Sequence, residues 1–252
     1  MKKLVLMAVF VALVAPARAD LVIDSFDVGS PYLEFGPGDA LQEDTVYSLF
    51  INPLEGSANT RKSSVFSGDD ASSGSLTIPG SGLATVALDT GTADSPWLRT
   101  STAGFSYASA LPLTMDLTGF AAASMLGAGS LRRGGTSEYD VVTLELFDVD
   151  GDSRYFAESL TNGAIGDISF NLGTDGQDNL YGVDGFFDLS EIVNISWQIN
   201  VGAESDQTAI LEYDVDAFTL TVVPVPGALL LGMLGLGTAG LRLRRRTTAG
   251  VR

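Results

Sequence analysis

Apolar and polar residues alternate with a period of two through most of the chain between residues 20 and 222. This alternation is typical of β-strands that bury one face. The segments that show it are 21–23 with Phe26, 45–51, 76–78, 84–88, 141–147, 154–160, 192–201 and 209–223. Short strands separated by glycine-rich turns predict one all-β domain, a β-sandwich or jelly roll, over residues 20–222.

The clearest predicted hairpin joins segments 141–147 and 154–160, because Asp150-Gly151 between them supplies the positive φ of a tight turn. Residues 67–75 and 127–137 are predicted loops, rich in serine or glycine. The acidic stretch 202–207 is predicted to join the last two strands, and residues 120–126 are compatible with one or two helical turns.

The first nineteen residues, 1–19, have the organisation of a Sec-type signal peptide. Lys2-Lys3 precedes the apolar run 4–15, and Ala17-Arg18-Ala19 forms an A-x-A cleavage site before Asp20. The Sec translocon and signal peptidase are therefore expected partners, and the mature chain is expected to begin at Asp20. An uncleaved N-terminal anchor is the alternative, but twelve apolar residues are short for a bilayer core of about 30 Å.

The C-terminal end predicts retention in a membrane. An apolar run, 227–241, lengthens to twenty residues if it starts at Val222, which suffices for a short or tilted transmembrane helix. The prolines before it fall in the first turn, where proline is tolerated. The alternative is a buried C-terminal helix of a soluble domain.

A cluster of arginines follows this run directly. Its members are Arg242, Arg244, Arg245 and Arg246. They resist translocation and place residues 247–252 in the cytoplasm. An exported N-terminus and this stop-transfer cluster together predict that residues 20–222 lie outside the cytoplasm.

The order V-P-x-P, short Gly/Ala/Leu helix and arginine cluster, over residues 223–246, resembles the PEP-CTERM class of sorting signals. The resemblance implies recognition by an exosortase, a membrane protease or transpeptidase, with Pro224, Val225 and Pro226 as the sorting motif. It also implies an inner-membrane protein facing the periplasm, which reaches the cell surface or the exterior after processing. Val225 replaces the central glutamate of that class, so the tail looks closer to its VPxPA-type variant, with Gly227 and then Ala228.

The two ends of the predicted domain carry a second, shorter resemblance. The opening L-V-I-D-S-F-D-V-G at 21–29 and the closing E-Y-D-V-D-A-F-T-L at 212–220 look like the first and last strands of carbohydrate-binding-module-like jelly rolls. Many such domains pair these two strands side by side. The resemblance therefore implies that the two ends of this domain are neighbours in one sheet.

Charge and composition restrict the function further. Residues 20–222 hold six basic residues against all thirty-one acidic ones, a formal charge of −25, which makes nucleic-acid binding improbable. The chain contains no histidine and no cysteine. This excludes Ser-His-Asp and Cys-His catalysis, disulfides, and zinc sites built on imidazole or thiolate. Stability must come from a hydrophobic core.

Calcium is the metal that the remaining acidic residues favour. Asp148, Asp150 and Asp152 alternate across the predicted turn, and Ca²⁺ takes carboxylate and carbonyl oxygens. The spacing departs from the EF-hand loop, and the alternative is that Asp150-Gly151 simply forms the turn with solvated aspartates beside it. A second, less specific candidate set is Asp175, Asp178 and Asp184.

Three functions follow from these features. We expect a non-enzymatic surface or matrix protein, with extracellular polysaccharide as a further partner. One alternative is a Ca²⁺-stabilised glycan-binding module, with aromatic residues either stacking on sugar rings or buried in the core. The aromatic candidates are Trp97, Tyr107, Tyr181, Trp197 and Tyr213. The other alternative is a carbohydrate-active enzyme that uses two carboxylates.

Overall fold

Strands form all the regular structure in the described part of the chain, as the period-two pattern predicts. The computed structural model describes residues 21–36, 42–47, 60–67, 71–92, 95–108, 114–135, 137–182, 185–205 and 207–222. The strands are β1 (Leu21–Asp24), β2 (Ser30–Phe35), β3 (Gln42–Tyr47), β4 (Thr60–Ser67), β5 (Ser73–Ile78), β6 (Ala84–Asp89), β7 (Ser95–Ala108), β8 (Phe120–Arg133), β9 (Val141–Asp148), β10 (Ser153–Ser159), β11 (Gly163–Ile165), β12 (Ile168–Asn171), β13 (Gln177–Asn179), β14 (Ile192–Ser205) and β15 (Ala209–Val222). Ala19–Val222 forms one compact unit.

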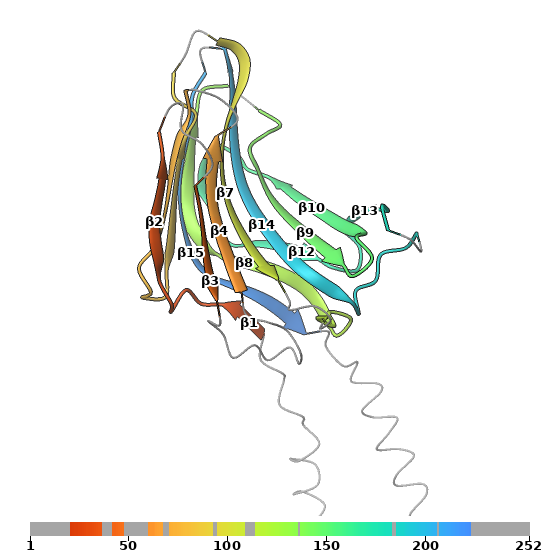
Figure 1. The fold of residues 1–252 in the computed structure, drawn as a ribbon. Helices are drawn as coiled ribbons and strands as arrows, with labels where there is room; N and C mark the ends of the chain where they lie inside the picture. Colours follow the sequence, from red (N-terminus) through yellow and green to blue (C-terminus); the bar gives the residue numbers. More distant parts are fainter. Residues whose placement is uncertain are drawn as a thin grey trace, which may run out of the picture. The chain divides into compact units, whose positions relative to one another are not determined.

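The strands build two antiparallel sheets. Sheet A has the order β11-β8-β15-β6-β5-β2, with β1 also beside β15 and β12 also beside β8. Sheet B has the order β13-β10-β9-β14-β7-β4-β3. Figure 1 shows the long strands β8 and β15 of one sheet and β7 and β14 of the other running through the middle of the domain. The prediction of an all-β sandwich is confirmed.

An aromatic cluster joins the two sheets in the core. Trp197 on β14 stacks on Phe218 of β15 with 5.0 Å between ring centroids. Phe105 on β7 meets the same Phe218 ring edge-on at 5.3 Å, and Phe26 packs against both phenylalanines at 5.6 Å. Aromatic pairs in these geometries contribute roughly 0.5–1.5 kcal/mol each beyond the area they bury. Residues from both sheets therefore share one core.

The first and last strands lie side by side, as the jelly-roll resemblance implies. Leu21 pairs with Leu220 and Val22 pairs with Thr219, and a bulge then shifts the register so that Asp24 lies opposite Phe218. The domain therefore begins and ends on adjacent strands of sheet A.

The hairpin predicted around Asp150-Gly151 is confirmed. Strands β9 and β10 pair from Phe147 opposite Ser153 onward, and Gly151 has a φ of +94°. Strand β3 covers the first part of the segment predicted at 45–51, and residues 48–51 lie outside the described residues, as does residue 223 of the last predicted strand.

The helical turns predicted at 120–126 are wrong, because these residues begin strand β8, which pairs with β12 on one side and β15 on the other. The loop predicted at 127–137 is also wrong in its first half, since β8 continues to Arg133. Gly129 is required there because an added Cβ would lie 2.3 Å from the carbonyl oxygen of Glu212. Glycine in this segment marks close strand packing rather than a loop.

The loop predicted at 202–207 is shorter than expected. Strand β14 continues to Ser205, and Gly202 pairs with Thr100 of β7. The backbone N–H of Gly202 also donates to the buried Asp140 carboxylate at 3.0 Å. Tertiary partners thus hold an acidic, glycine-containing stretch in strand conformation. The loop predicted at 67–75 is likewise wrong at its two ends, because β4 includes Ser67 and β5 begins at Ser73.

Candidate functional site

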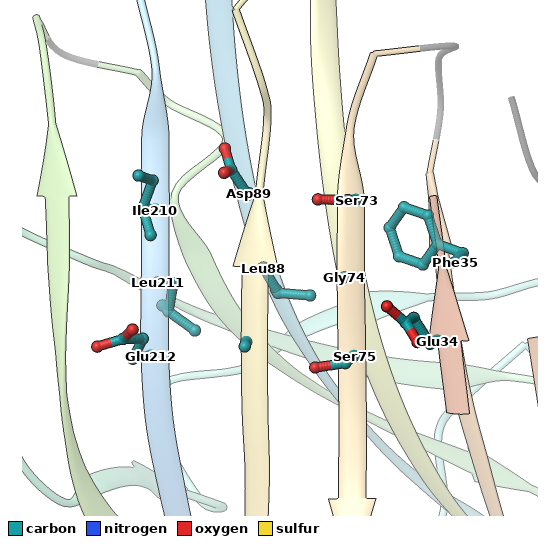
Figure 2. Close-up of a pocket in the computed structure, with 11 residues that line it drawn as sticks. Glu34, Phe35, Ser73, Gly74, Ser75, Leu88, Asp89, Ile210, Leu211 and Glu212 are labelled. Carbon is teal, nitrogen blue, oxygen red and sulfur yellow. The ribbon is translucent and has the colours of Figure 1, made fainter. Parts of the chain in front are cut away.

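A shallow groove crosses the outer face of sheet A (Figure 2). It holds about 240 Å³ and runs over strands β2, β5, β6 and β15. The residues that line it are Glu34, Phe35, Ser73, Gly74, Ser75, Ala87, Leu88, Asp89, Ile210, Leu211 and Glu212. A ligand can reach this groove from solvent, because Glu34 and Glu212 at its two ends are exposed.

The strand register explains the shape of the groove. Glu34 pairs with Ser75, Ser75 with Ala87, and Ala87 with Glu212, so these four residues form one row across four strands. The middle of the row is low because serine and alanine are small. Neighbouring strands lie about 4.8 Å apart, so the backbones of the two glutamates are roughly 14 Å apart at its two ends.

The groove is acidic. Glu34, Asp89 and Glu212 line it, and the serines of β5 add hydroxyl groups. Arg132 Nη2 lies 3.9 Å from Glu212 Oε1, but both side chains are 67% exposed, and such a pair contributes little in water. Carboxylates and hydroxyls accept hydrogen bonds, so this surface suits ligands rich in hydroxyl or amino groups.

The turn between β9 and β10 brings together two of the three aspartates predicted to bind calcium. The Oδ1 atom of Asp148 accepts the backbone N–H groups of Asp150 at 3.1 Å and Asp152 at 2.9 Å. Its Oδ2 atom accepts the N–H of Asp188 at 3.1 Å, and the N–H of Gly182 donates to Oδ1 of Asp152. Asp148 and Asp152 are buried, whereas Asp150 faces solvent at the turn.

The second predicted calcium set is not assembled among the described residues. Asp175 accepts the Thr174 hydroxyl and the Asn171 N–H, which together lower the pKa of its carboxyl. Asp178 forms a forked ion pair with Arg154. Asp184 lies outside the described residues. Within the described ranges, no group of three or more acidic, histidine or cysteine side chains converges as a metal site.

Most of the aromatic residues considered for sugar stacking are core residues. Tyr107, Trp197 and Tyr213 are buried, and burial raises the pKa of both tyrosine hydroxyls. The side chain of Trp97 lies outside what the structure describes. Tyr181, in contrast, is 84% exposed. The sequence pattern does not distinguish buried from exposed aromatic residues here, because it does not show whether a ring on a strand or loop points into the core or into solvent.

Tyr181 lies in an exposed apolar segment, described at residues 180–182 and 185–186, in which the sequence singled out no other residue. Leu180 and Phe186 are 50% and 57% exposed on either side of it. The base of the segment is held by Arg154, whose guanidinium lies 4.7 Å from the centre of the Phe187 ring while it also binds Asp178. This segment and the turn at Asp148 and Asp152 form a second candidate region, at strands β9, β10 and β13 of sheet B, whereas the groove lies on sheet A.

The predicted processing and anchoring residues lie outside the described residues. These are Ala17, Ala19 and Asp20 at the signal cleavage site, Pro224, Val225 and Pro226 of the sorting motif, and Arg242, Arg244, Arg245 and Arg246 of the stop-transfer cluster. Over the residues for which structure is described, no helix has the length and hydropathy needed to cross a bilayer.

No family model and no curated protein matches this chain. Among solved structures it is similar to PfGH50B, with 14% identity and a TM-score of 0.27 over 53% of this chain and 21% of that chain. It is also similar to an agarase, AgWH50C, with 13% identity and a TM-score of 0.29 over 56% and 21%. For an exo-beta-agarase the identity is 13% and the TM-score 0.28, over 72% of this chain and 25% of that chain. The chain spans a quarter or less of the length of each.

Proposed function

We propose that this protein is an exported, membrane-retained and exosortase-processed surface or matrix protein with no enzymatic role. The observation that carries the proposal is the order of the tail, in which Pro224-Val225-Pro226 precedes an apolar run and an arginine cluster. The A-x-A site before Asp20 supports export of the segment between them.

The position of the motif supports processing of a folded substrate. Val222 is the last residue of strand β15 and of the compact unit, and Pro224 follows two residues later. A cut near the prolines therefore removes the tail without removing any strand of the sandwich. The released domain keeps its two sheets and its core.

The acidic outer surface supports attachment through the tail alone. Groove residues on β2, β6 and β15 add carboxylates to one face of a domain with a strongly negative charge. Such a surface is repelled by anionic lipid headgroups and favours solubility. The domain thus depends on its C-terminal segment for membrane retention and is soluble once that segment is cut.

The mass of the protein from its native host, in membrane and released fractions, tests this proposal. We expect a released form that runs from Asp20 to a cut near Pro224–Pro226, and its loss when both prolines are replaced by alanine. Replacing the two prolines Pro31 and Pro79 of the domain is the control, and the released form should persist with them. If every molecule recovered runs uncut from Asp20 to Arg252 and stays in the membrane fraction, the proposal of processing by a sortase is overturned.

A glycan-binding role is the second candidate, and the exposure of Tyr181 is the observation that favours it. A tyrosine ring has an apolar face and a polar edge, which suits stacking on a sugar ring. The groove of sheet A offers a second surface with hydroxyl and carboxylate acceptors. Polysaccharide in the envelope would then be the partner of the released domain.

A further inference from the structure

Among the residues that the structure describes, four aspartates are buried almost completely, and they fall into two groups. Asp24 and Asp140 each form an ion pair with an arginine, Arg61 and Arg133 respectively. Asp148 and Asp152 are 3% and 0% exposed. Among the described residues, neither of these two aspartates has a basic side chain as a partner. A buried carboxylate without a compensating positive charge is strongly unfavourable.

Backbone amides satisfy only part of this pair. Asp148 accepts three N–H groups through its two oxygens, and Asp152 accepts the N–H of Gly182 through Oδ1. Oδ2 of Asp152 is buried and has no hydrogen-bond partner in the described structure. A carboxylate has about four acceptor positions, so both side chains keep free lone pairs. A buried oxygen left in this state points to an ion or an ordered water.

Arg154, the arginine nearest in sequence to Asp148 and Asp152, binds other groups. Arg154 donates through Nε and Nη2 to Asp178, and through Nη1 to the carbonyl oxygen of Leu172 at 3.3 Å. The Asp148 carboxylate lies against the backbone of Asp152, because its Oδ1 accepts the N–H of Asp152 at 2.9 Å. Both buried charges therefore belong to one turn.

We propose that Asp148 and Asp152 hold one divalent cation, Ca²⁺, between the β9–β10 turn and the segment around Gly182 and Asp188. Two carboxylates neutralise its charge, and backbone carbonyls and water complete the six to eight oxygen ligands that Ca²⁺ takes. Asp150 is not part of this site, since its side chain faces solvent. The cation links the turn to the segment that carries Tyr181. The site is independent of whether the tail is processed.

Calcium titration of the full-length chain in detergent, after EDTA treatment, tests the site. We expect calorimetry to give one site per chain, and saturation at about 100 times Kd to raise Tm by roughly 5–10 °C. Magnesium at equal ionic strength is the control for diffuse binding to the acidic surface. A wild-type protein whose Tm is the same in calcium and in EDTA would overturn the proposal, and the unpaired oxygen would then be assigned to water.

Two matched variants locate the site. Asp152→Asn is expected to weaken calcium binding at least about tenfold, a loss that even outer-shell partners of a metal can cause. In EDTA it should be as stable as the wild type or more stable, because it removes an uncompensated buried charge. Asp150→Asn removes a charge from the same turn and should bind calcium like the wild type. Equal losses in both variants would contradict a built site. If Asp152→Asn does not fold, the wild-type calcium and magnesium titrations still decide.

Discussion

Asp24 on β1 and Arg61 on β4 form an ion pair between the two sheets, with Arg61 Nη1 2.9 Å from Asp24 Oδ2 and both side chains fully buried. Further hydrogen bonds surround the pair. Tyr107 donates its hydroxyl to Asp24 at 2.9 Å, the N–H of Phe26 donates to Asp24 at 2.8 Å, and Arg61 Nη2 donates to the carbonyl of Val28 at 2.8 Å. The pair anchors the first strand to the opposite sheet.

Arg61→Gln is therefore expected to destabilise the domain by about 3–5 kcal/mol, because it leaves the Asp24 carboxylate buried without its guanidinium. Urea unfolding followed by circular dichroism measures the change. Arg132→Gln is the matched control, since Arg132 approaches Glu212 only at 3.9 Å on an exposed surface. We expect it to change stability by less than about 0.5 kcal/mol. Similar effects of the two variants would contradict a structural role for the buried pair.

Tyr107→Phe is expected to cost about 1.5–3 kcal/mol at pH 7, because it removes a hydrogen bond to a charged group. Burial, and then the charge of Asp24, raise the pKa of the Tyr107 hydroxyl well above its usual value of 10.0. Its folded-state pKa is thus above its unfolded-state pKa. The stability linked to this group is complete below pH 10 and is lost as the pH rises from there through the folded-state pKa.

The difference in unfolding free energy between wild type and Tyr107→Phe should therefore narrow above about pH 10, by up to about 1.4 kcal/mol for each pH unit. Urea unfolding at pH 7, 9, 10 and 11 measures it. Burial also raises the pKa of Tyr213 and Tyr155, so wild type and Tyr107→Phe both lose stability at alkaline pH. The difference between their unfolding free energies isolates the contribution of Tyr107. A difference in unfolding free energy that stays constant from pH 7 to pH 11 would argue against a link between stability and the Tyr107 hydroxyl.

Gly129→Ala is expected to destabilise the domain by more than about 2 kcal/mol, because the new methyl group would overlap backbone atoms of β15. An added Cβ would lie 2.3 Å from the Glu212 carbonyl oxygen and 2.7 Å from the Tyr213 Cα. Gly119→Ala is the control, since a Cβ there meets no atom within 4 Å. Thermal unfolding of both variants measures the effect, and a Tm for Gly129→Ala near that of the control would show that β8 can move away from β15.

Tyr181→Ala tests the glycan-binding candidate. Affinity electrophoresis in gels that contain polysaccharide from the native envelope should show retardation of the wild type, and a loss of affinity of roughly two- to tenfold in the variant, the range expected for one aromatic contact. Tyr139→Ala is the control, because Tyr139 is an exposed tyrosine on another loop.

A variant of the groove on sheet A is tested in the same affinity electrophoresis. Ala87→Trp fills the floor of the groove between Ser75 and Glu212 and leaves the Tyr181 segment unchanged. Loss of retardation in Ala87→Trp alone would place the polysaccharide in the groove. Normal retardation in both variants would count against both surfaces, and absence of retardation in the wild type would leave the surface-protein proposal without a glycan partner.

Fold class and the main hairpin could be predicted from the sequence because they depend on local signals. Period-two alternation marks strands such as β6 and β14, and Asp150-Gly151 marks the turn. Strands β4 and β7 were missed, since Arg61, Lys62 and several serines and threonines dilute their apolar pattern. The same cause explains β8, where alanine and glycine resemble a helix or a loop until β15 and β12 pair with it.

The candidate sites depend on contacts that no local pattern contains. The sequence places three alternating aspartates in one turn, but only the fold buries Asp148 and Asp152 and leaves Asp150 in solvent. Likewise, the groove exists because the register aligns Glu34 of β2 with Glu212 of β15, residues far apart along the chain. Among the predicted aromatic residues, tertiary packing buries Tyr107, Trp197 and Tyr213 and exposes Tyr181.

The all-β character of the domain follows from short runs of neighbouring residues, and the export and tail signals that we predict rest on such runs as well. Which charges are compensated depends instead on contacts between residues far apart along the chain. Asp24 and Asp148 are each the last residue of a strand, and the sequence around them does not show which of the two will face an arginine. Within the described ranges, folding brings Arg61 to Asp24 and backbone amides alone to Asp148, so long-range packing sets the electrostatic environment of each carboxylate.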